Sequence, residues 1–157
     1  MIDPKYTDIC TIAIASVPGI ERTGLKILEL RDYYAKALMP LEGNGNHVGM
    51  MYAGSLFTLG EFAGGIIHIA SMDFSKFVPI VKEVRIRFRR PAMTDITMEV
   101  TMPEEEARRL ESEAEKNGKA DYVLSLHLKD ESGETVAEVS GTWQVRKMPE
   151  GMGLQFK

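Results

Sequence analysis

Two ionisable side chains stand in a stretch of the chain that is otherwise made mainly of aliphatic, aromatic and small residues. The stretch is 53–72, and the two side chains are Glu61 and His68. Burying an ionised carboxylate without partners is very unfavourable, so an acid in such a place indicates a task. Glu61 either acts as a general base or nucleophile with a pKa raised by burial, or bonds to an amide or arginine and holds a dimer together. For His68 we expect a core histidine with satisfied hydrogen bonds.

The spacing of these residues gives the predicted helix two unlike faces. Each residue turns a helix by about 100°, so Gly54, Glu61 and His68, seven apart, share one stripe. The other members of this stripe are small: Thr58, Gly64 and Gly65. The opposite side is bulky and apolar: Leu56, Leu59, Phe62, Ala63, Ile66 and Ile69. We expect the bulky face to pack on a sheet and the small face to admit a second subunit or a ligand.

Gly54 marks the first turn of this helix. Unpaired amides and the positive end of the helix dipole can stabilise a developing oxyanion there. A carboxylate two turns further on, at Glu61, can handle a water molecule. These are the parts needed to hydrolyse an acyl ester or thioester.

Other catalytic chemistry has little support in the sequence. His47, His68 and His127 do not have the spacing of metal ligands, so no metal site is predicted. Cys10 is the single cysteine and lies in an apolar run, which is typical of a small core residue. No cofactor is expected.

The bulk properties restrict partners and location. A net charge of -4 argues against a nucleic-acid binder. The stretch 53–72 is long enough to span a membrane, but its acid, its histidine and its glycines favour a buried helix. The N-terminal apolar run 9–17 is short and follows acidic residues, so it does not fit a signal peptide. We expect a cytoplasmic protein that uses neither membrane nor nucleic acid.

The first half of the chain predicts mixed elements. A helix is expected to open at Pro4 and to stop before Pro18-Gly19. The segment 25–31 is expected to form a strand that continues to about Leu38. Pro40 and the glycine–asparagine cluster 43–46 then predict a loop that leads into the long helix.

The second half alternates with period two, which indicates an antiparallel sheet with one covered face. The expected strands are 84–88, 96–102, 122–128 and 137–145. A helix over 103–116 interrupts them, with acids at its start and Asn117-Gly118 at its end. A nearly uniformly apolar helix must be covered on most sides in water. We therefore predict one domain, 1–157, of the α+β class: a hot-dog fold, in which a curved antiparallel sheet wraps a long central helix.

The segment from Asn46 to Glu61 resembles the signature of hot-dog acyl-CoA thioesterases of the phenylacetate-degradation type, roughly N-x-x-G-T-x-H-G-G-x-x-x-x-L-x-D. The matching residues are Asn46, Gly49, Gly54, Leu59 and Glu61, the last at the position of the catalytic acid. The segment 84–91 also resembles the second strand of that family. Two departures stand out: Tyr52 replaces a frequent histidine, and glutamate replaces the usual aspartate. This version resembles a branch of the family whose substrates are often unassigned.

The resemblance implies a homodimer or a dimer of dimers with active sites between subunits. By this resemblance, Glu61 activates the attacking water and Gly54 holds the oxyanion. Asn46 orients either the water or the thioester carbonyl. Tyr52 either donates a hydrogen bond or packs at the interface. The coenzyme A moiety belongs to the substrate. The substrate-binding residues assigned in this way are Gly49, Ser55, Thr58, Arg87, Arg89 and Arg90. The arginines either contact phosphates of coenzyme A or form a solvated face.

The predicted activity is hydrolysis of an acyl-CoA or acyl-carrier thioester. The acyl pocket is expected to contain Phe57, Phe62 and Phe74 or their neighbours. Two alternatives stay open: a domain that binds acyl-CoA without cleaving it, and a hydroxyacyl thioester dehydratase that would use a pair such as His47 and Glu61.

Overall fold

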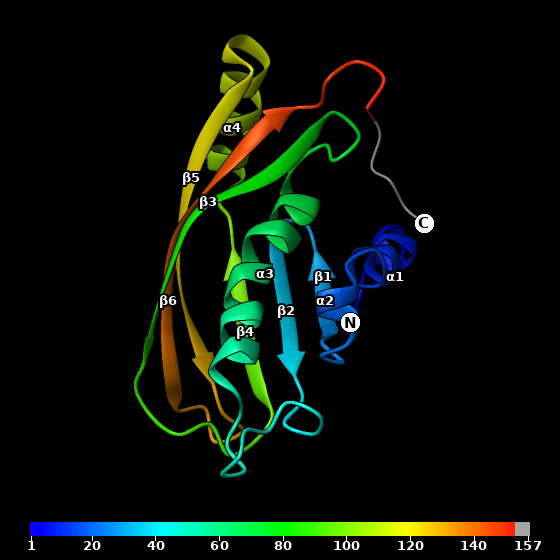
Figure 1. The fold of residues 1–157 in the computed structure, drawn as a ribbon. Coiled ribbons are helices and arrows are strands. Elements are labelled where there is room, and N and C mark those ends of the chain that lie inside the picture. The colour runs from blue at the N-terminus through cyan, green and yellow to red at the C-terminus, as the bar shows by residue number, and fades with distance from the viewer. Residues whose placement is uncertain (153–157) are drawn as a thin grey trace.

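A curved antiparallel sheet of six strands wraps one long helix, α3 (Ala53–Ser71), in the computed structural model, which describes residues 1–152 (Figure 1). The strands follow the order β1-β2-β4-β5-β6-β3 across the sheet. Their bounds are Lys26–Arg31 (β1), Tyr34–Met39 (β2), Phe77–Phe88 (β3), Ile96–Thr101 (β4), Lys119–Lys129 (β5) and Thr135–Lys147 (β6). The predicted hot-dog arrangement is confirmed.

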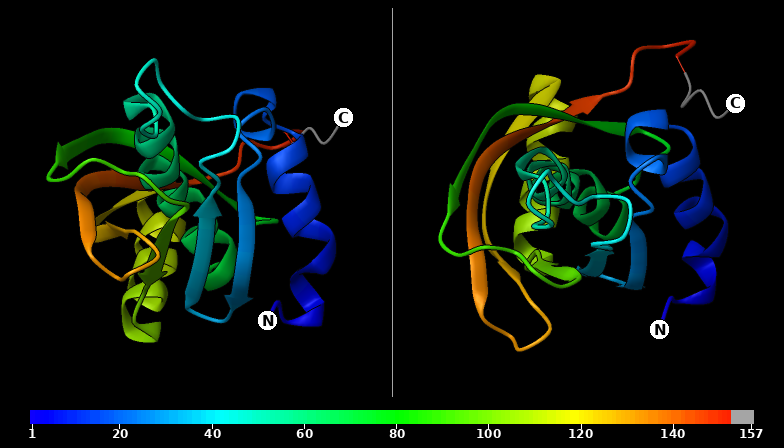
Figure 2. Two further views of the ribbon diagram at one scale, coloured as in Figure 1. Left: turned by 90° about the horizontal axis from the view of Figure 1, so that it is seen from below. Right: turned by 60° about the horizontal axis from the view of Figure 1, so that its bottom comes forward.

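A small helical layer precedes the sheet. It consists of η1 (Pro4–Tyr6), α1 (Thr7–Ala15) and α2 (Pro18–Glu21). The first two cover most of the span predicted as one helix, whereas α2 begins at Pro18, where that helix was expected to have stopped. The Tyr6 hydroxyl donates to Asp32 at 2.7 Å and to the Ala70 carbonyl at 3.3 Å. These bonds fix the beginning of α1 to the β1–β2 turn and to the end of α3. Figure 2 shows α1 and α2 on the β1 side of the molecule.

The segment predicted as one strand up to Leu38 is instead the hairpin of β1 and β2, so that prediction was wrong. Tyr33 adopts a left-handed conformation (φ 64°), which reverses the chain between the two strands. Its amide donates to the Ala70 carbonyl at 2.9 Å, and its carbonyl accepts from the Met102 amide at 3.1 Å. Tertiary hydrogen bonds therefore hold a turn that carries no glycine.

The central helix packs on β6 through its glycines. A Cβ at Gly60 would lie 2.7 Å from a methyl of Val139, and one at Gly64 would overlap the indole of Trp143. The Tyr122 hydroxyl donates to the Gly64 carbonyl at 2.8 Å. Gly64, expected on the open face, is thus a close-packing position against the sheet. The helix is long and apolar enough to span a membrane, but most of it is buried inside the protein.

The sheet is interrupted between β4 and β5. These strands pair only at Thr97 with Lys129 and at Met98 with Leu128, and they diverge beyond that point. The connecting helix α4 (Glu104–Asn117) ends at Gly118 in the left-handed conformation, as its sequence predicts. It buries Ala107, Leu110 and Ala114.

The edge strand β3 begins seven residues before the predicted start at Val84. It pairs with β6 along one side, with an irregularity between Val81 and Glu83. Ile80 and Val81 remain 43% and 45% exposed. The described part of the chain leaves the other side of β3 unpaired.

Candidate active site

Glu61 lies on the partly open face of α3, two turns beyond the start of the helix. Its carboxylate forms no hydrogen bond or ion pair within residues 1–152, and burial alone raises its pKa. The interpretation that Glu61 is tied to an amide or arginine of its own chain is therefore not supported. A partly buried carboxylate with an elevated pKa and no partner is suited to accept a proton from water.

The N-terminus of α3 is a second polar feature on this face. The helix starts after Tyr52 without a side-chain cap, and the first amides with described acceptors are those of Ser55 and Leu56, which both bond to the Tyr52 carbonyl. The amides of Ala53 and Gly54 thus stay available for an oxyanion. Gly54 also allows the Tyr52 ring to lie against the helix, because a Cβ there would overlap that ring.

The loop before α3 is organised by Asn44, a buried residue that the motif comparison missed. Its amide nitrogen donates to the carbonyls of Thr23 and Pro40 at 2.7 and 2.8 Å. Its side-chain oxygen accepts from the Ser55 hydroxyl at 2.8 Å. Ser55, predicted to bind substrate, therefore already has its hydroxyl engaged. The cluster 43–46 predicted a loop, but the sequence cannot tell which asparagine is buried.

Asn46 and Gly49 shape the tip of the same loop. The Asn46 side-chain oxygen accepts from the amides of Val48 and Met50 at 2.9 and 3.1 Å. Gly49 has a φ of 81°, as expected for the glycine of a turn. Within one chain, Asn46 makes no described bond with Glu61. The exposed His47 on this loop likewise has no described bond with Glu61, so the structure does not assemble the pair that a dehydratase would use.

The remaining predicted site residues on or just before α3 either bond within the helix or have exposed side chains. The Thr58 hydroxyl donates to the Gly54 carbonyl at 2.9 Å. Tyr52 is 59% exposed and Phe57 is 39% exposed. Tyr52 thus has room to contact either a ligand or a second subunit.

His68 is fully buried, as expected for a core histidine, but only one of its nitrogens is satisfied. Nε2 lies 3.0 Å from the Phe77 carbonyl, so Nε2 carries the proton and donates. Nδ1 has no hydrogen-bond partner in the described structure. Burial lowers the pKa of His68 to about 4, so the ring is neutral at physiological pH.

An apolar cavity of about 360 Å³ lies beside Glu61, between the helical layer α1–α2 and the C-terminal half of α3. Segment 74–79 contributes the rest of its wall. Phe62 and Phe74 line it, whereas Phe57, which was expected with them in an acyl pocket, does not. We call this space the α1–α3 cavity. A carboxylate at the wall of an apolar cavity is typical of a small-molecule site.

Arg85 and Arg87 of β3, and Arg89 just beyond its end, lie on the face of the sheet opposite α3. Arg87 pairs in register with Glu138 of β6, whereas the neighbouring Ile86 pairs with Val139, which faces α3. Arg89 and Arg90 form ion pairs with Glu138 and Glu134 at 2.7 and 2.9 Å. Arg87 forms no ion pair among the described residues. Together with Arg85 it lines a hollow of about 350 Å³.

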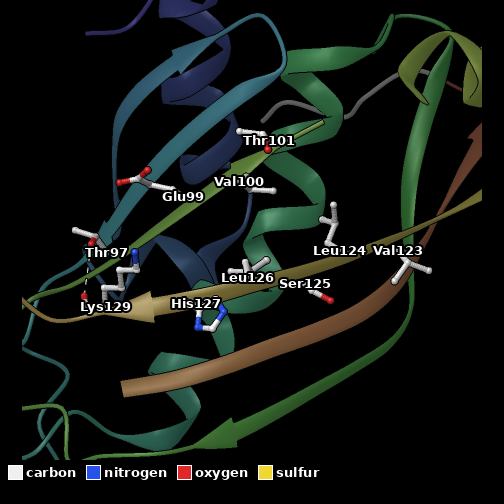
Figure 3. A pocket seen from close by; sticks show the side chains of 10 residues that line it. All are labelled: Thr97, Glu99, Val100, Thr101, Val123, Leu124, Ser125, Leu126, His127 and Lys129. Carbon is white, nitrogen blue, oxygen red and sulfur yellow. Dashed lines mark hydrogen bonds between the residues drawn. The ribbon is translucent and has the colours of Figure 1, made fainter. Parts of the chain in front are cut away.

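A hollow of about 420 Å³, larger than the α1–α3 cavity, lies where β4 and β5 diverge and is lined by no residue of α3 (Figure 3). Its lining includes Glu99, His127 and Lys129. No group of three or more potential metal ligands occurs in the described chain. Volume alone therefore does not identify the reactive site, and Glu61 with the adjacent cavity remains the better candidate.

Comparisons with known proteins agree with the fold. Residues 9–145 match a family described as a domain of unknown function, DUF4442. None of the curated proteins matches the chain.

Solved structures resemble the chain over most of its length. One is a protein of unknown function from Pseudomonas aeruginosa, described as a probable thioesterase, with 43% identity, a TM-score of 0.86 and coverage of 94% of this chain and 99% of that one. A thioesterase from Haemophilus influenzae has 14% identity, a TM-score of 0.70 and coverage of 90% and 91%. A mutant thioesterase from Staphylococcus aureus has 18% identity, a TM-score of 0.67 and coverage of 83% and 99%. The last two show the fold alone. The chain belongs to the DUF4442 family, within the hot-dog thioesterase superfamily.

Proposed function

We propose that the protein hydrolyses acyl thioesters, with acyl-CoA as the substrate class and Glu61 as the general base. The observation that carries the proposal is the unpartnered Glu61 carboxylate, which lies two turns from the free amides of Ala53 and Gly54 and lines an apolar cavity. The similar Pseudomonas aeruginosa protein, described as a probable thioesterase, supports the reaction class.

The reaction balances with these groups. Glu61 accepts a proton as water attacks the thioester carbonyl, and the carbonyl electrons move to an oxyanion held by the amides of Ala53 and Gly54. When the carbonyl re-forms, the carbon–sulfur bond breaks. The proton on Glu61 then passes to the leaving thiolate, which leaves a carboxylic acid and a free thiol. No cofactor enters the reaction.

The proposal includes a second copy of the chain. A long unpaired edge strand with exposed Ile80 and Val81 favours strand-to-strand association. Association along β3 would also cover the open face of α3 and bring the partner's loop near Glu61. In that arrangement Asn46 orients the water or carbonyl, and Tyr52 donates a hydrogen bond. Ile80→Asp should shift the protein toward monomer in sedimentation analysis.

The test is a thiol-release screen over acyl-CoA, acyl-pantetheine and acyl carrier protein thioesters. Wild type should release thiol from at least one class, and Glu61→Ala should remove most of that turnover. The exposed loop variant Glu42→Gln serves as control and should retain wild-type turnover. Equal rates for Glu61→Ala and wild type on the best substrate would exclude this mechanism.

One observation favours the binding-only alternative: no histidine or other acid–base group bonds to Glu61 within the described chain. A non-catalytic domain would show a higher melting temperature with acyl-CoA and no thiol release across the whole panel.

A further inference from the structure

The α1–α3 cavity has the Glu61 carboxylate at one end and a mainly apolar body, in which Ser16 and the neutral His68 are the other polar lining residues. Among its lining residues on α3, Glu61 lies nearest the helix N-terminus and Ile69 lies farthest from it. At 1.5 Å per residue this stretch spans about 12 Å. Phe74 and Phe77 line the cavity beyond it, next to the end of α3.

The covering elements restrict what can occupy this space. Ala13 and Val17 belong to its outer wall, so the chain's own helical layer separates the cavity from solvent on that side. Tyr6 fixes the start of this layer through its bonds to Asp32 and Ala70. A volume of about 360 Å³ beside such a wall suits a slender apolar chain.

Gly65 keeps the cavity open one turn beyond Glu61. A Cβ at Gly65 would meet no atom within 4 Å, whereas one at Gly64 would overlap Trp143. The backbone therefore leaves free space about 6 Å along the helix from Glu61, where the middle carbons of an acyl group would lie if its carbonyl were beside Glu61.

We propose that the α1–α3 cavity binds the acyl chain of the substrate, that the preferred chain is straight and saturated with on the order of eight to ten carbons, and that Gly65 and Ala13 set this preference. The inference rests on the proposed thioester hydrolysis. In this arrangement the N-terminal helical layer takes part in substrate selection. Phe74 and Phe77 then lie at the end of the cavity farthest from Glu61.

The test compares two alanines of α1 under the same substitution. Ala13 lines the cavity, whereas Ala15 is exposed and does not, so Ala13→Leu and Ala15→Leu differ only in whether the cavity is filled. The value of kcat/KM is measured over straight-chain acyl-CoA substrates from two to sixteen carbons. For wild type we expect about a fourfold rise per added methylene up to the preferred length, followed by a plateau or fall.

Ala13→Leu should lower kcat/KM for decanoyl-CoA by about a hundredfold while acetyl-CoA hydrolysis stays near the wild-type value. Ala15→Leu should match wild type at every length. Gly65→Leu, which fills the cavity from the opposite wall, should act as Ala13→Leu does. Loss at all chain lengths alike, or an unchanged length profile in both filled variants, would overturn the assignment.

A binding measurement separates this inference from the proposed function. If wild type hydrolyses no thioester, the catalytic proposal fails, and calorimetric binding of decanoate decides about the cavity. Decanoate binding that Ala13→Leu abolishes and Ala15→Leu preserves supports the assignment. Absent binding, or binding equal in both variants, refutes it. Because Ala13 is only half-buried and α1 lies outside the sheet, Ala13→Leu tests the inference even if Gly65→Leu fails to fold.

Discussion

Gly64 and Gly65 are adjacent in sequence and serve opposite purposes on α3. Gly64 faces β6, where the indole of Trp143 leaves no room for a side chain, and Gly65 faces the α1–α3 cavity, where a Cβ would touch nothing. The first glycine allows close packing, and the second preserves empty space. The helix therefore has one face that packs against the sheet and another on which Glu61 has no partner among the described residues.

We expect the strongest effect from a substitution that disrupts the packing of α3 on β6. Gly64→Ala should destabilise the protein by about 3 kcal/mol, because the added methyl must displace Trp143 in the core. Gly65→Ala should instead stabilise it by about 0.5–1 kcal/mol, because alanine favours the helix and nothing obstructs it. Chemical denaturation of both variants measures the contrast. Equal changes in the free energy of unfolding would contradict it.

The buried histidine at the cavity wall should make stability depend on pH. The pKa of His68 is depressed to about 4, so the unfolded chain binds a proton near pH 6.5 while the folded chain does not. The contribution of His68 to the free energy of unfolding is therefore fully present above pH 6.5. The free energy of unfolding falls by about 2 kcal/mol between pH 7 and pH 5.

His68→Gln should reduce that pH dependence, because glutamine can still donate to the Phe77 carbonyl but does not titrate. His127→Gln on the exposed face of β5 is the control and should retain it. Urea denaturation at pH 5 and pH 7 measures both. An unchanged slope in His68→Gln would show that another group is responsible.

A smaller contrast is that between Arg87, which forms no ion pair among the described residues, and Arg90, which is paired with Glu134. Arg87→Ala should lower kcat/KM for acyl-CoA about tenfold if its guanidinium contacts a phosphate. The ion-paired Arg90 should matter less in the same substitution. Acyl-pantetheine, which lacks the nucleotide, should be hydrolysed equally by all three proteins. A parallel loss on acyl-pantetheine would assign Arg87 a structural role.

The weakest of these effects is that of the Glu61 charge on the stability of the protein. The pKa of Glu61 lies above its ordinary value in the folded protein, so ionisation of this carboxyl opposes folding. The resulting loss in the free energy of unfolding grows as the pH rises from the ordinary pKa through the raised one. Glu61→Gln should therefore raise Tm at pH 8 and lose that advantage near pH 4. Thermal scans at both pH values test the sign. A lower Tm at pH 8 would indicate a stabilising partner for the carboxylate.

Much of the fold followed from periodicity. Alternation predicted β5 and β6, the apolar stretch predicted α3, and acids followed by Asn117-Gly118 predicted α4. The turn at Tyr33 escaped prediction, because tertiary bonds to Ala70 and Met102 stabilise its left-handed backbone and no glycine marks it.

The candidate site was predicted only in part. Glu61 stood out as an acid in an apolar stretch, and Gly54 as the start of the helix. Gly64 was placed on the wrong face, because a composition of small residues does not tell close packing from open space. The α1–α3 cavity could not be foreseen either, since it depends on how far the N-terminal helices lie from α3.

The proposed role of Glu61 is to activate water, with no bonding partner for its carboxylate among residues 1–152. Its most direct test measures kcat and Tm of Glu61→Gln at pH 8 on the best thioester from the screen. We expect kcat to fall by about 10²–10⁴-fold and Tm to stay unchanged or rise. A variant that turns over the thioester within twofold of the wild-type rate would contradict it.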